Sequence, residues 1–277
     1  MVRLNQLSNI AGTLASTPRM PVLFIGHGNP MNAIWNNPYT QSLRKLGDGI
    51  LLSHKPKAIM VVSAHWLTSG SYVNMSKTPE VLYDFRGFPN ELFKVKYSAA
   101  GAPLFAKETS VLSNQITPTT DWGLDHGAWG VLKHLFPDAT IPVYQLSIDY
   151  GKSMQYHFDL AKQLQTLREK GVLVLGSGNI VHNLRLSMQN LVAGGGVPYD
   201  WAIEFDEWVK QKLDARDFDS LISYEQIGLS AKLSVPTVDH YVPLLYALGL
   251  ASDKEALEYT FEGIEYGGLS MRCFKIG

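Results

Sequence analysis

The sequence has a single cysteine, no long apolar run and no block of charge of one sign. The one thiol, Cys273, excludes a disulfide within the chain and fits a reducing compartment. Its setting in an apolar segment predicts a small buried residue rather than a nucleophile. No window reaches the roughly 20 apolar residues of a membrane helix. The first 17 residues also lack the continuous apolar segment of a signal peptide. We therefore expect a soluble, cytoplasmic protein.

Charge is balanced, with 24 Lys and Arg residues against 25 Asp and Glu residues. A partner with a phosphate backbone would require a cationic face, so we expect no nucleic acid and no membrane partner. Hydrophobic residues make up 45% and charged residues 18%, which is typical of a globular chain. A length of 277 residues favours one domain over 1–277, with 1–18 as a loose N-terminal arm. Either a monomer or a small homo-oligomer fits this composition.

Several common catalytic motifs are also missing. The chain has no HExxH or paired CxxC zinc pattern, no GxxxxGK[ST] phosphate loop and no GxSxG elbow. The stretch "GSGNIV", residues 176–181, follows an apolar run but has Val181 where a dinucleotide fingerprint has its third glycine. These absences argue against the common helix-borne and structural zinc patterns, against phosphate-loop and dinucleotide binding, and against serine hydrolysis.

Continuous apolar runs predict strands that are buried on both faces of a largely parallel sheet. Amphipathic stretches with helical spacing alternate with these runs, which indicates a layered α/β fold with helices on both faces. The end of the chain looks like two closing strands, 257–266 and 269–277, in antiparallel pairing. The remaining expected strands are 21–26, 58–64, 141–148 and 171–177, and the expected helices are 38–54, 103–114, 126–136, 156–171, 200–218 and 237–250.

Three histidines follow apolar runs directly or closely: His27 in "GHGNP", His65 in "SAHW" and His182 in "GNIVHN". Ligands bind beyond the carboxyl ends of strands in α/β sheets, so one edge of the sheet should gather these side chains. His126 at a helix start and His240 in "DHYVPLL" have similar settings. Imidazole is a common metal ligand, so a metal site is one interpretation and ordinary turn residues are the other. The other three histidines, His54, His134 and His157, are expected to be solvated or packed without a chemical role.

Six motifs in order, "GHGNPMN", "VVSAHW", "YDFRGFP", "DHGAWGVL", "GSGNIVHNL" and "DHYVPLLYALG", resemble those of the LigB-type (class III) extradiol ring-cleavage dioxygenases. The resemblance is strongest to the 4,5-DOPA extradiol dioxygenase branch and extends from Met20 to Gly277. It implies a three-layer αβα domain with a mixed, largely parallel sheet and one non-haem metal. That metal is Fe(II) in active members, and zinc is common in bacterial members as isolated.

The same resemblance assigns roles to residues. His27, His65 and His240 match metal ligands, while His182 matches the histidine that acts as acid and base and also touches the metal. His126 matches a histidine next to the metal or the substrate. Many extradiol enzymes use two histidines and one carboxylate. A histidine in place of the carboxylate removes one negative charge from the set of metal ligands, which favours zinc over Fe(II).

The implied reaction inserts O2 into a catechol ring next to the diol, and the resemblance points to 4,5-cleavage of L-DOPA or a related catechol. Arg86, in "YDFRGFP", is expected either to pair with a substrate carboxylate or to form a salt bridge that fixes its loop. Tyr241, beside His240, is an expected wall of the substrate site because a flat aromatic ligand requires aromatic neighbours.

Two other functions fit the same residues. A zinc-dependent hydrolase would use the metal to activate water and would be indifferent to O2. A non-catalytic metal-binding protein is the third interpretation, because the same fold occurs in the signalling-associated Memo family. Retention of four of the histidines, His27, His65, His182 and His240, argues against a degenerate site.

Overall fold

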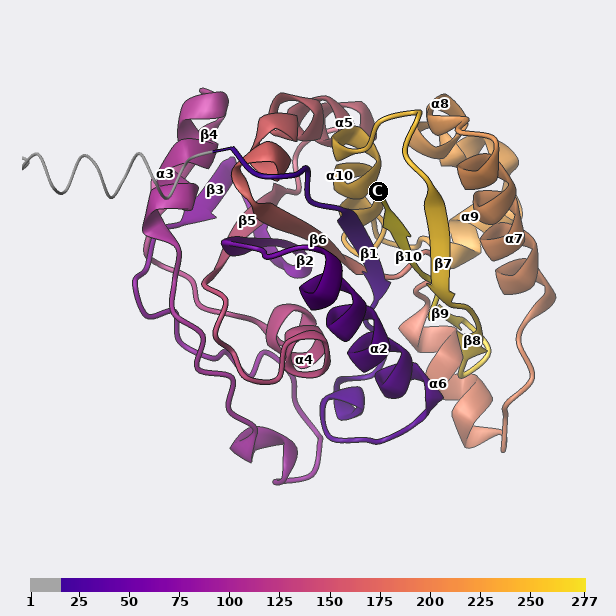
Figure 1. Cartoon of the computed structure of the whole chain (residues 1–277). Coiled ribbons are helices and arrows are strands. Elements are labelled where there is room, and N and C mark those ends of the chain that lie inside the picture. Colours follow the sequence, from indigo (N-terminus) through magenta and orange to yellow (C-terminus); the bar gives the residue numbers. More distant parts are fainter. Residues whose placement is uncertain (1–15) are drawn as a thin grey trace, which may run out of the picture.

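The computed structural model describes residues 16–277 (Figure 1). Its main sheet has eight strands in the order β4-β3-β5-β2-β6-β1-β10-β7, and β8 and β9 form a separate pair. The strands are β1 (Val22–Gly26), β2 (Ala58–Thr68), β3 (Ser71–Asn74), β4 (Ile116–Thr119), β5 (Val143–Asp149), β6 (Val172–Gly178), β7 (Leu257–Phe261), β8 (Ile264–Glu265), β9 (Leu269–Ser270) and β10 (Cys273–Ile276).

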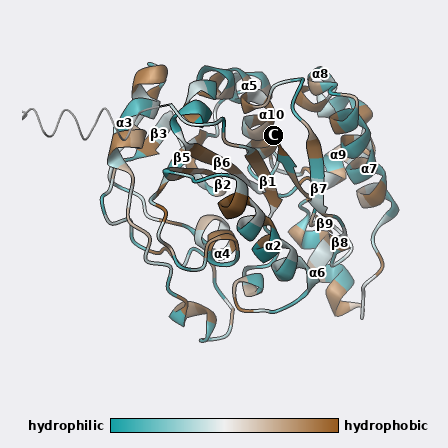
Figure 2. Cartoon of the chain, viewed as in Figure 1, coloured by the Kyte–Doolittle hydropathy of each residue, from teal (hydrophilic) through white to brown (hydrophobic). Residues whose placement is uncertain are grey.

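The four central strands β5, β2, β6 and β1 are mutually parallel, as their continuous apolar runs predict. Every residue of β1, β5 and β6 is buried. β10 pairs antiparallel with both β1 and β7, so the expected antiparallel closing strand is confirmed. Figure 2 shows hydrophobic residues concentrated on these central strands.

Helices cover both faces of the sheet, and the expected α/β class is confirmed. Alternate residues of β1 enter two separate cores: Val22 and Phe24 pack on the side of α5 and α10, and Leu23 and Ile25 pack on the side of α2 and α4 (Figure 1). The α-helices are α2 (Pro38–Ser53), α3 (Pro103–Leu112), α4 (His126–Leu135), α5 (Met154–Gln163), α6 (Leu184–Val192), α7 (Asp200–Asp214), α8 (Phe218–Ile222), α9 (Leu229–Ser234) and α10 (Val242–Leu250). The 3-10 helices are η1 (Pro30–Ala33), η2 (Leu92–Lys94), η3 (Gln165–Lys170) and η4 (Tyr224–Ile227).

Several boundaries differ from the expectation. The expected closing strand 257–266 divides into β7 and β8, the expected strand 269–277 divides into β9 and β10, and the helix expected over 200–218 ends at Asp214. β2 continues through His65 to Thr68, with an irregular register after Val62, so this histidine lies inside a strand. The last helix begins at Val242, which leaves His240 in the preceding turn. The expected helix over 156–171 divides into α5 and η3. α6 was not predicted, and most of its apolar residues, Leu184, Met188, Leu191 and Val192, are exposed instead of facing the core.

The described end of the expected N-terminal arm contacts η3. Thr17 donates its backbone N–H to the carbonyl of Glu169 at 2.6 Å, so the arm is bound at this residue. Residues 1–15 lie outside the described part of the chain. At the other end, Cys273 is buried, and burial raises the pKa of its thiol to about 12, as a packing role predicts. Within residues 16–277, no helix has both the length and the apolarity needed to cross a membrane.

The expectation that His157 is solvated is wrong, because the residue is only 1% exposed. Its Nδ1 lies 3.2 Å from the hydroxyl of Tyr246, across the α5 and α10 interface. Burial lowers the pKa of His157 to about 4, although Asp149 partly opposes this shift. The folded protein therefore keeps this imidazole neutral well below the pH at which the unfolded chain takes up a proton.

A pH-dependent loss of stability follows from His157. Because its folded pKa is depressed, its contribution is complete above pH 6.5 and is lost as the pH falls toward 4. A shift of this size corresponds to about 3 kcal/mol for the single group. Denaturant unfolding at pH 7 and pH 4.5 should show a smaller pH dependence for His157→Gln than for the wild type. His54→Gln, at a half-exposed histidine, provides the control. Equal pH dependence of stability in the wild type and in His157→Gln would contradict the assignment.

Candidate metal centre and active site

His27 is held at the end of β1 by backbone and side-chain contacts. Its N–H donates to the carbonyl of Gly178 at 3.0 Å, and the chain then turns at Gly28, whose φ of 65° favours glycine. The Ser177 hydroxyl donates to the carbonyl of Gly127 at 2.6 Å. Ser177 therefore accepts from His27 Nδ1, which lies 3.0 Å away. This arrangement places the proton of the neutral imidazole on Nδ1 and leaves the Nε2 lone pair free to bind a ligand.

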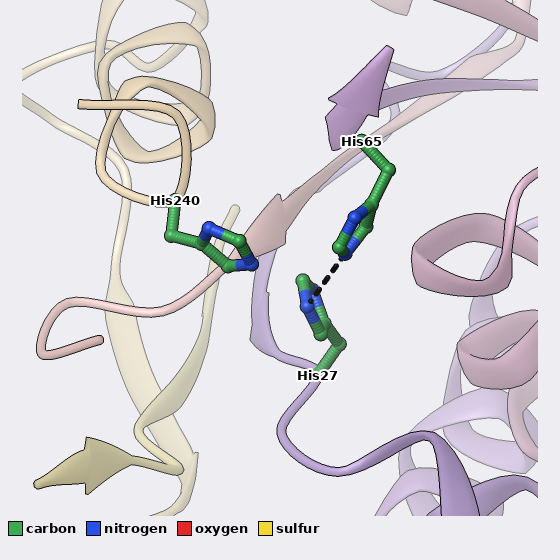
Figure 3. Close-up of side chains that lie close together, drawn as sticks. All are labelled: His27, His65 and His240. Atoms are coloured by element: carbon green, nitrogen blue, oxygen red, sulfur yellow. Dashed lines mark hydrogen bonds between the residues drawn. The ribbon is translucent and has the colours of Figure 1, made fainter. Parts of the chain in front are cut away.

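His65 approaches His27 from β2, the strand beyond β6. The two Nε2 atoms are 3.2 Å apart, and Figure 3 shows the rings pointing toward each other. Two imidazole nitrogens bound at about 2.0–2.1 Å to one ion are about 2.9 Å apart at a right angle and about 3.4 Å apart at a tetrahedral angle. The observed separation falls between these values, so the pair fits two ligands of one metal ion.

His240 reaches the same point from the turn before α10 (Figure 3). Its carbonyl accepts from the N–H of Asn179 at 2.9 Å, and a Cβ on Gly178 would lie only 2.2 Å from that carbonyl oxygen. Gly178, the second glycine of "GSGN", therefore permits this close approach because it has no Cβ. The Asp239 carboxylate accepts from His240 Nδ1, which directs the Nε2 lone pair toward the other two rings.

One donor nitrogen from each of His27, His65 and His240 lies within 4.8 Å of the others. Burial and the neighbouring imidazoles lower the pKa values of His27 and His240 well below the ordinary range. Burial also lowers the pKa of His65, to about 4, against the opposing effect of nearby carboxylates. All three rings are therefore neutral at pH 7, which is the form that binds zinc or Fe(II). The donor set fits a divalent metal.

His182 lies beside this group, just beyond β6. Its ring stacks on that of His240 with centroids 3.4 Å apart and planes within 6°. It belongs to a second group, with Asp239 and His240, and not to the three-histidine group. Burial lowers its pKa to about 4, with Asp239 opposing and His65 and His126 assisting. The neutral ring faces the cavity, where it can accept a proton.

Asp84 and His126 form the opposite side of the site. The Asp84 carboxylate accepts from both the backbone N–H and the Nδ1 of His126, each at 2.9 Å, and lies 3.6 Å from Nδ1 of His65. Burial alone would raise the pKa of Asp84, but hydrogen bonding and the charge of the two histidines lower it. Asp84 belongs to "YDFRGFP", the motif in which Arg86 was the expected contact, and this carboxylate was not predicted. The position of "YDFRGFP" among the histidine-bearing motifs was the only sequence feature that pointed to Asp84.

Asp84→Asn should lower turnover while leaving the fold intact. The amide keeps an acceptor near His126 but removes the negative charge that orients two imidazoles, and such outer contacts are typically worth about 10- to 100-fold. Steady-state O2 uptake and bound metal should be measured together. Asp121→Asn removes an exposed carboxylate that forms no side-chain hydrogen bond or ion pair within residues 16–277, and it serves as the matched control. Wild-type turnover in Asp84→Asn would contradict this positioning role.

The histidines form the floor of a cavity of about 350 Å³, a volume suited to a small molecule. All five of them line it, together with Asp84. The walls above the histidines are mostly apolar and include Phe85, Phe88, Leu184, Met188, Leu191 and Leu269. The polar side chains of Asn29, Ser187 and Tyr266 also line the cavity.

Neither expected substrate contact lines this cavity. Arg86 is exposed and forms no ion pair with any residue of the described chain, so the alternative of a loop-fixing salt bridge is not supported. Tyr241 is fully buried, packs on Tyr224 and donates its hydroxyl to the carbonyl of Leu221 at 3.0 Å. The turn that aims His240 into the cavity directs the adjacent Tyr241 into the core, which corrects the expected wall position.

Fold and site together define an α/β protein with a histidine-lined cavity at the carboxyl ends of its parallel strands. A family model described as the catalytic LigB subunit of aromatic ring-opening dioxygenase matches residues 14–272. The chain therefore belongs to the LigB family. The expected resemblance and the expected enzyme class, a ring-opening dioxygenase, are both confirmed.

Individual relatives agree with the family model. The chain is 44% identical to a 4,5-DOPA dioxygenase extradiol of Escherichia coli K12, over 95% of this chain and 97% of the relative. It is 36% identical to a protein of the same name from Beta vulgaris, over 91% and 94%. A crystal structure of an uncharacterized Escherichia coli K12 protein superposes with a TM-score of 0.81 at 41% identity, covering 94% of this chain and all of that one.

Proposed function

We propose that the protein is a metal-dependent extradiol dioxygenase, with L-DOPA or a related catechol as substrate and residues 1–277 acting as one catalytic domain. The observation that carries the proposal is the cluster of three neutral imidazoles on the floor of a cavity with mostly apolar walls. In the overall reaction one ring bond next to the diol breaks and both atoms of O2 enter the product. The ring carbons supply the four electrons that reduce O2.

His27, His65 and His240 would hold the metal. The chemistry supplied by bound Fe(II) is the joining of catechol and O2 at one centre, with electron density passing from the ring to oxygen. The hydrogen bonds of Ser177 and Asp239 keep the donor nitrogens aimed at that centre. Three neutral ligands also suit zinc, so we expect zinc to compete for the site.

His182 would act as the acid and base, with support from His126. Its neutral ring faces the cavity and can take a proton from a catechol hydroxyl, then return it when the ring bond breaks. The Asp84 carboxylate accepts from Nδ1 of His126, which fixes the orientation of this ring at the cavity. The mostly apolar walls exclude water from the reacting atoms.

The test is anaerobic removal of metal, reconstitution with Fe(II) or Zn(II), and measurement of O2 uptake with L-DOPA and a panel of catechols. Uptake with a yellow ring-opened product, confined to the Fe(II) protein, is the expected result. An absence of uptake with every catechol in a protein that binds Fe(II) stoichiometrically would overturn the proposal. Hydrolysis by the zinc protein would then support the hydrolase interpretation.

A further inference from the structure

Three polar side chains, those of Asn29, Ser187 and Tyr266, line the cavity and have no part in holding the metal. Two of them lie where α6 meets the β8–β9 hairpin (Figure 1). The backbone N–H of Asn183, before α6, donates to the carbonyl of Gly268 at 3.1 Å, and a Cβ on Gly268 would lie 3.1 Å from the Oγ of Ser187. The hairpin that carries Tyr266 is therefore held against the helix that carries Ser187.

The turn of this hairpin presents Tyr266 to the cavity. Tyr266 has a φ of 50°, in the left-handed region that a bulky residue rarely adopts, and such positions are frequent at ligand sites. Asn29 Nδ2 donates to the Tyr266 hydroxyl at 3.4 Å, and Asn29 Oδ1 accepts from the backbone N–H of Met31 at 2.9 Å. Because the Tyr266 hydroxyl accepts from Asn29, its own proton is available to a ligand.

The second hydroxyl, that of Ser187, is buried and unpaired. The residue is only 3% exposed, and its Oγ has no hydrogen-bond partner within residues 16–277. A serine inside a helix commonly bonds the carbonyl four residues earlier, but Ser187 does not make this bond to Asn183. An unpaired buried hydroxyl is unfavourable. Since Ser187 lines the cavity, a bound ligand can supply the missing partner and recover this free energy.

This part of the wall offers hydroxyls instead of charges. No Lys or Arg is among the described residues that line the cavity. Burial raises the pKa of Tyr266, and the charge of Glu265 raises it further, so the phenol keeps its proton at neutral pH. Each hydroxyl can both donate and accept, so the pair fits an amino-acid group, whose carboxylate accepts and whose ammonium donates. Apolar neighbours such as Leu184 and Met188 strengthen these hydrogen bonds by excluding water.

We propose that the hydroxyls of Ser187 and Tyr266 form a polar subsite that hydrogen-bonds the amino-acid group of an L-DOPA-type catechol, and that Asn29 positions Tyr266 for this role. The diol of the catechol would occupy the metal on the floor of the cavity, so the wall above faces the ring substituent. This inference rests on the proposed dioxygenase function and assigns residues to the recognition of its substrate class.

Two variants that each remove one oxygen test the subsite. The readout is kcat/KM of the Fe(II) protein for L-DOPA relative to 4-propylcatechol, whose side chain has three carbons and no polar group. In Ser187→Ala and in Tyr266→Phe this ratio should fall by about tenfold or more, as expected for loss of a hydrogen bond to a charged group. An unchanged ratio in both variants would overturn the inference.

Matched controls separate recognition from packing. Ser230→Ala removes a helical hydroxyl that is also buried and unpaired within the described chain, and Tyr150→Phe removes an exposed phenol. Neither residue lines the cavity, so both variants should keep the wild-type ratio. An equal loss of kcat/KM for L-DOPA and 4-propylcatechol in Ser187→Ala and Tyr266→Phe would assign these residues to packing and would contradict the subsite.

Binding separates this inference from the proposed function. Dissociation constants of L-DOPA and 4-propylcatechol are measured with the Zn(II) protein, where no turnover is required. Weaker binding of L-DOPA alone in Ser187→Ala and Tyr266→Phe, without O2 uptake by the Fe(II) wild type, would support the subsite and overturn the dioxygenase proposal. O2 uptake by the wild type, with both variants keeping its ratios of affinity and of kcat/KM, would do the reverse.

Discussion

Replacing His27 by alanine is expected to lower metal affinity by more than about 100-fold. A loss of about 100-fold is the upper end of the effect of replacing a residue that only supports a metal ligand. His27 is 6% exposed, its Nδ1 is engaged by Ser177, and its Nε2 faces His65 at 3.2 Å. No other described side chain can replace it at the end of β1. O2 uptake should fall below detection, because the reaction requires catechol and O2 at one centre.

Metal content and stability distinguish this effect from misfolding. Metal added at 100 times its dissociation constant should stabilise the wild type by about 2.7 kcal/mol, and the same concentration should leave His27→Ala almost unchanged. Without metal, the variant and the wild type should both unfold cooperatively. His54→Ala serves as the control, since His54 is half-buried beside a separate surface hollow. One bound metal per chain in His27→Ala would exclude His27 as a ligand.

The central strands could be predicted because their sequences are apolar on both faces. β1, β5 and β6 are buried throughout, and the apolar runs that predict them end within two residues of the observed bounds. β3 and β4 were missed, since "SYVN" and "ITPT" are too short and too polar to produce a signal. The exposed apolar face of α6 faces a cavity, so its pattern did not resemble a core helix.

The site residues that follow parallel strands could be predicted from the sequence, whereas those in long connections could not. His27 and His182 follow β1 and β6, so the direction of the strands alone places them at one edge. Asp84 lies 42 residues before His126 in a long connection, and no local period encodes their contact. His157 was misassigned because a polar helix face at that point packs on Tyr246 instead of facing water.

His182→Phe is expected to retain the metal and much of the catechol affinity while lowering kcat by about 10²- to 10⁴-fold, the range for loss of a positioned acid and base. Phenylalanine can keep the stacked contact with His240, whose ring centroid lies 3.4 Å away, but it can neither take nor return a proton. Single-turnover O2 uptake, a catechol dissociation constant and metal analysis on one preparation provide the three readouts.

The comparison of His182→Phe with His27→Ala decides whether His182 is a ligand. The structure places the donor nitrogens of His27, His65 and His240 within 4.8 Å of one another and groups His182 separately with Asp239. A loss of metal in His182→Phe equal to that in His27→Ala would make His182 a fourth ligand. Retained metal with full turnover would remove it from the proton chemistry, leaving His126, hydrogen-bonded to Asp84, as the remaining imidazole in the cavity able to move a proton.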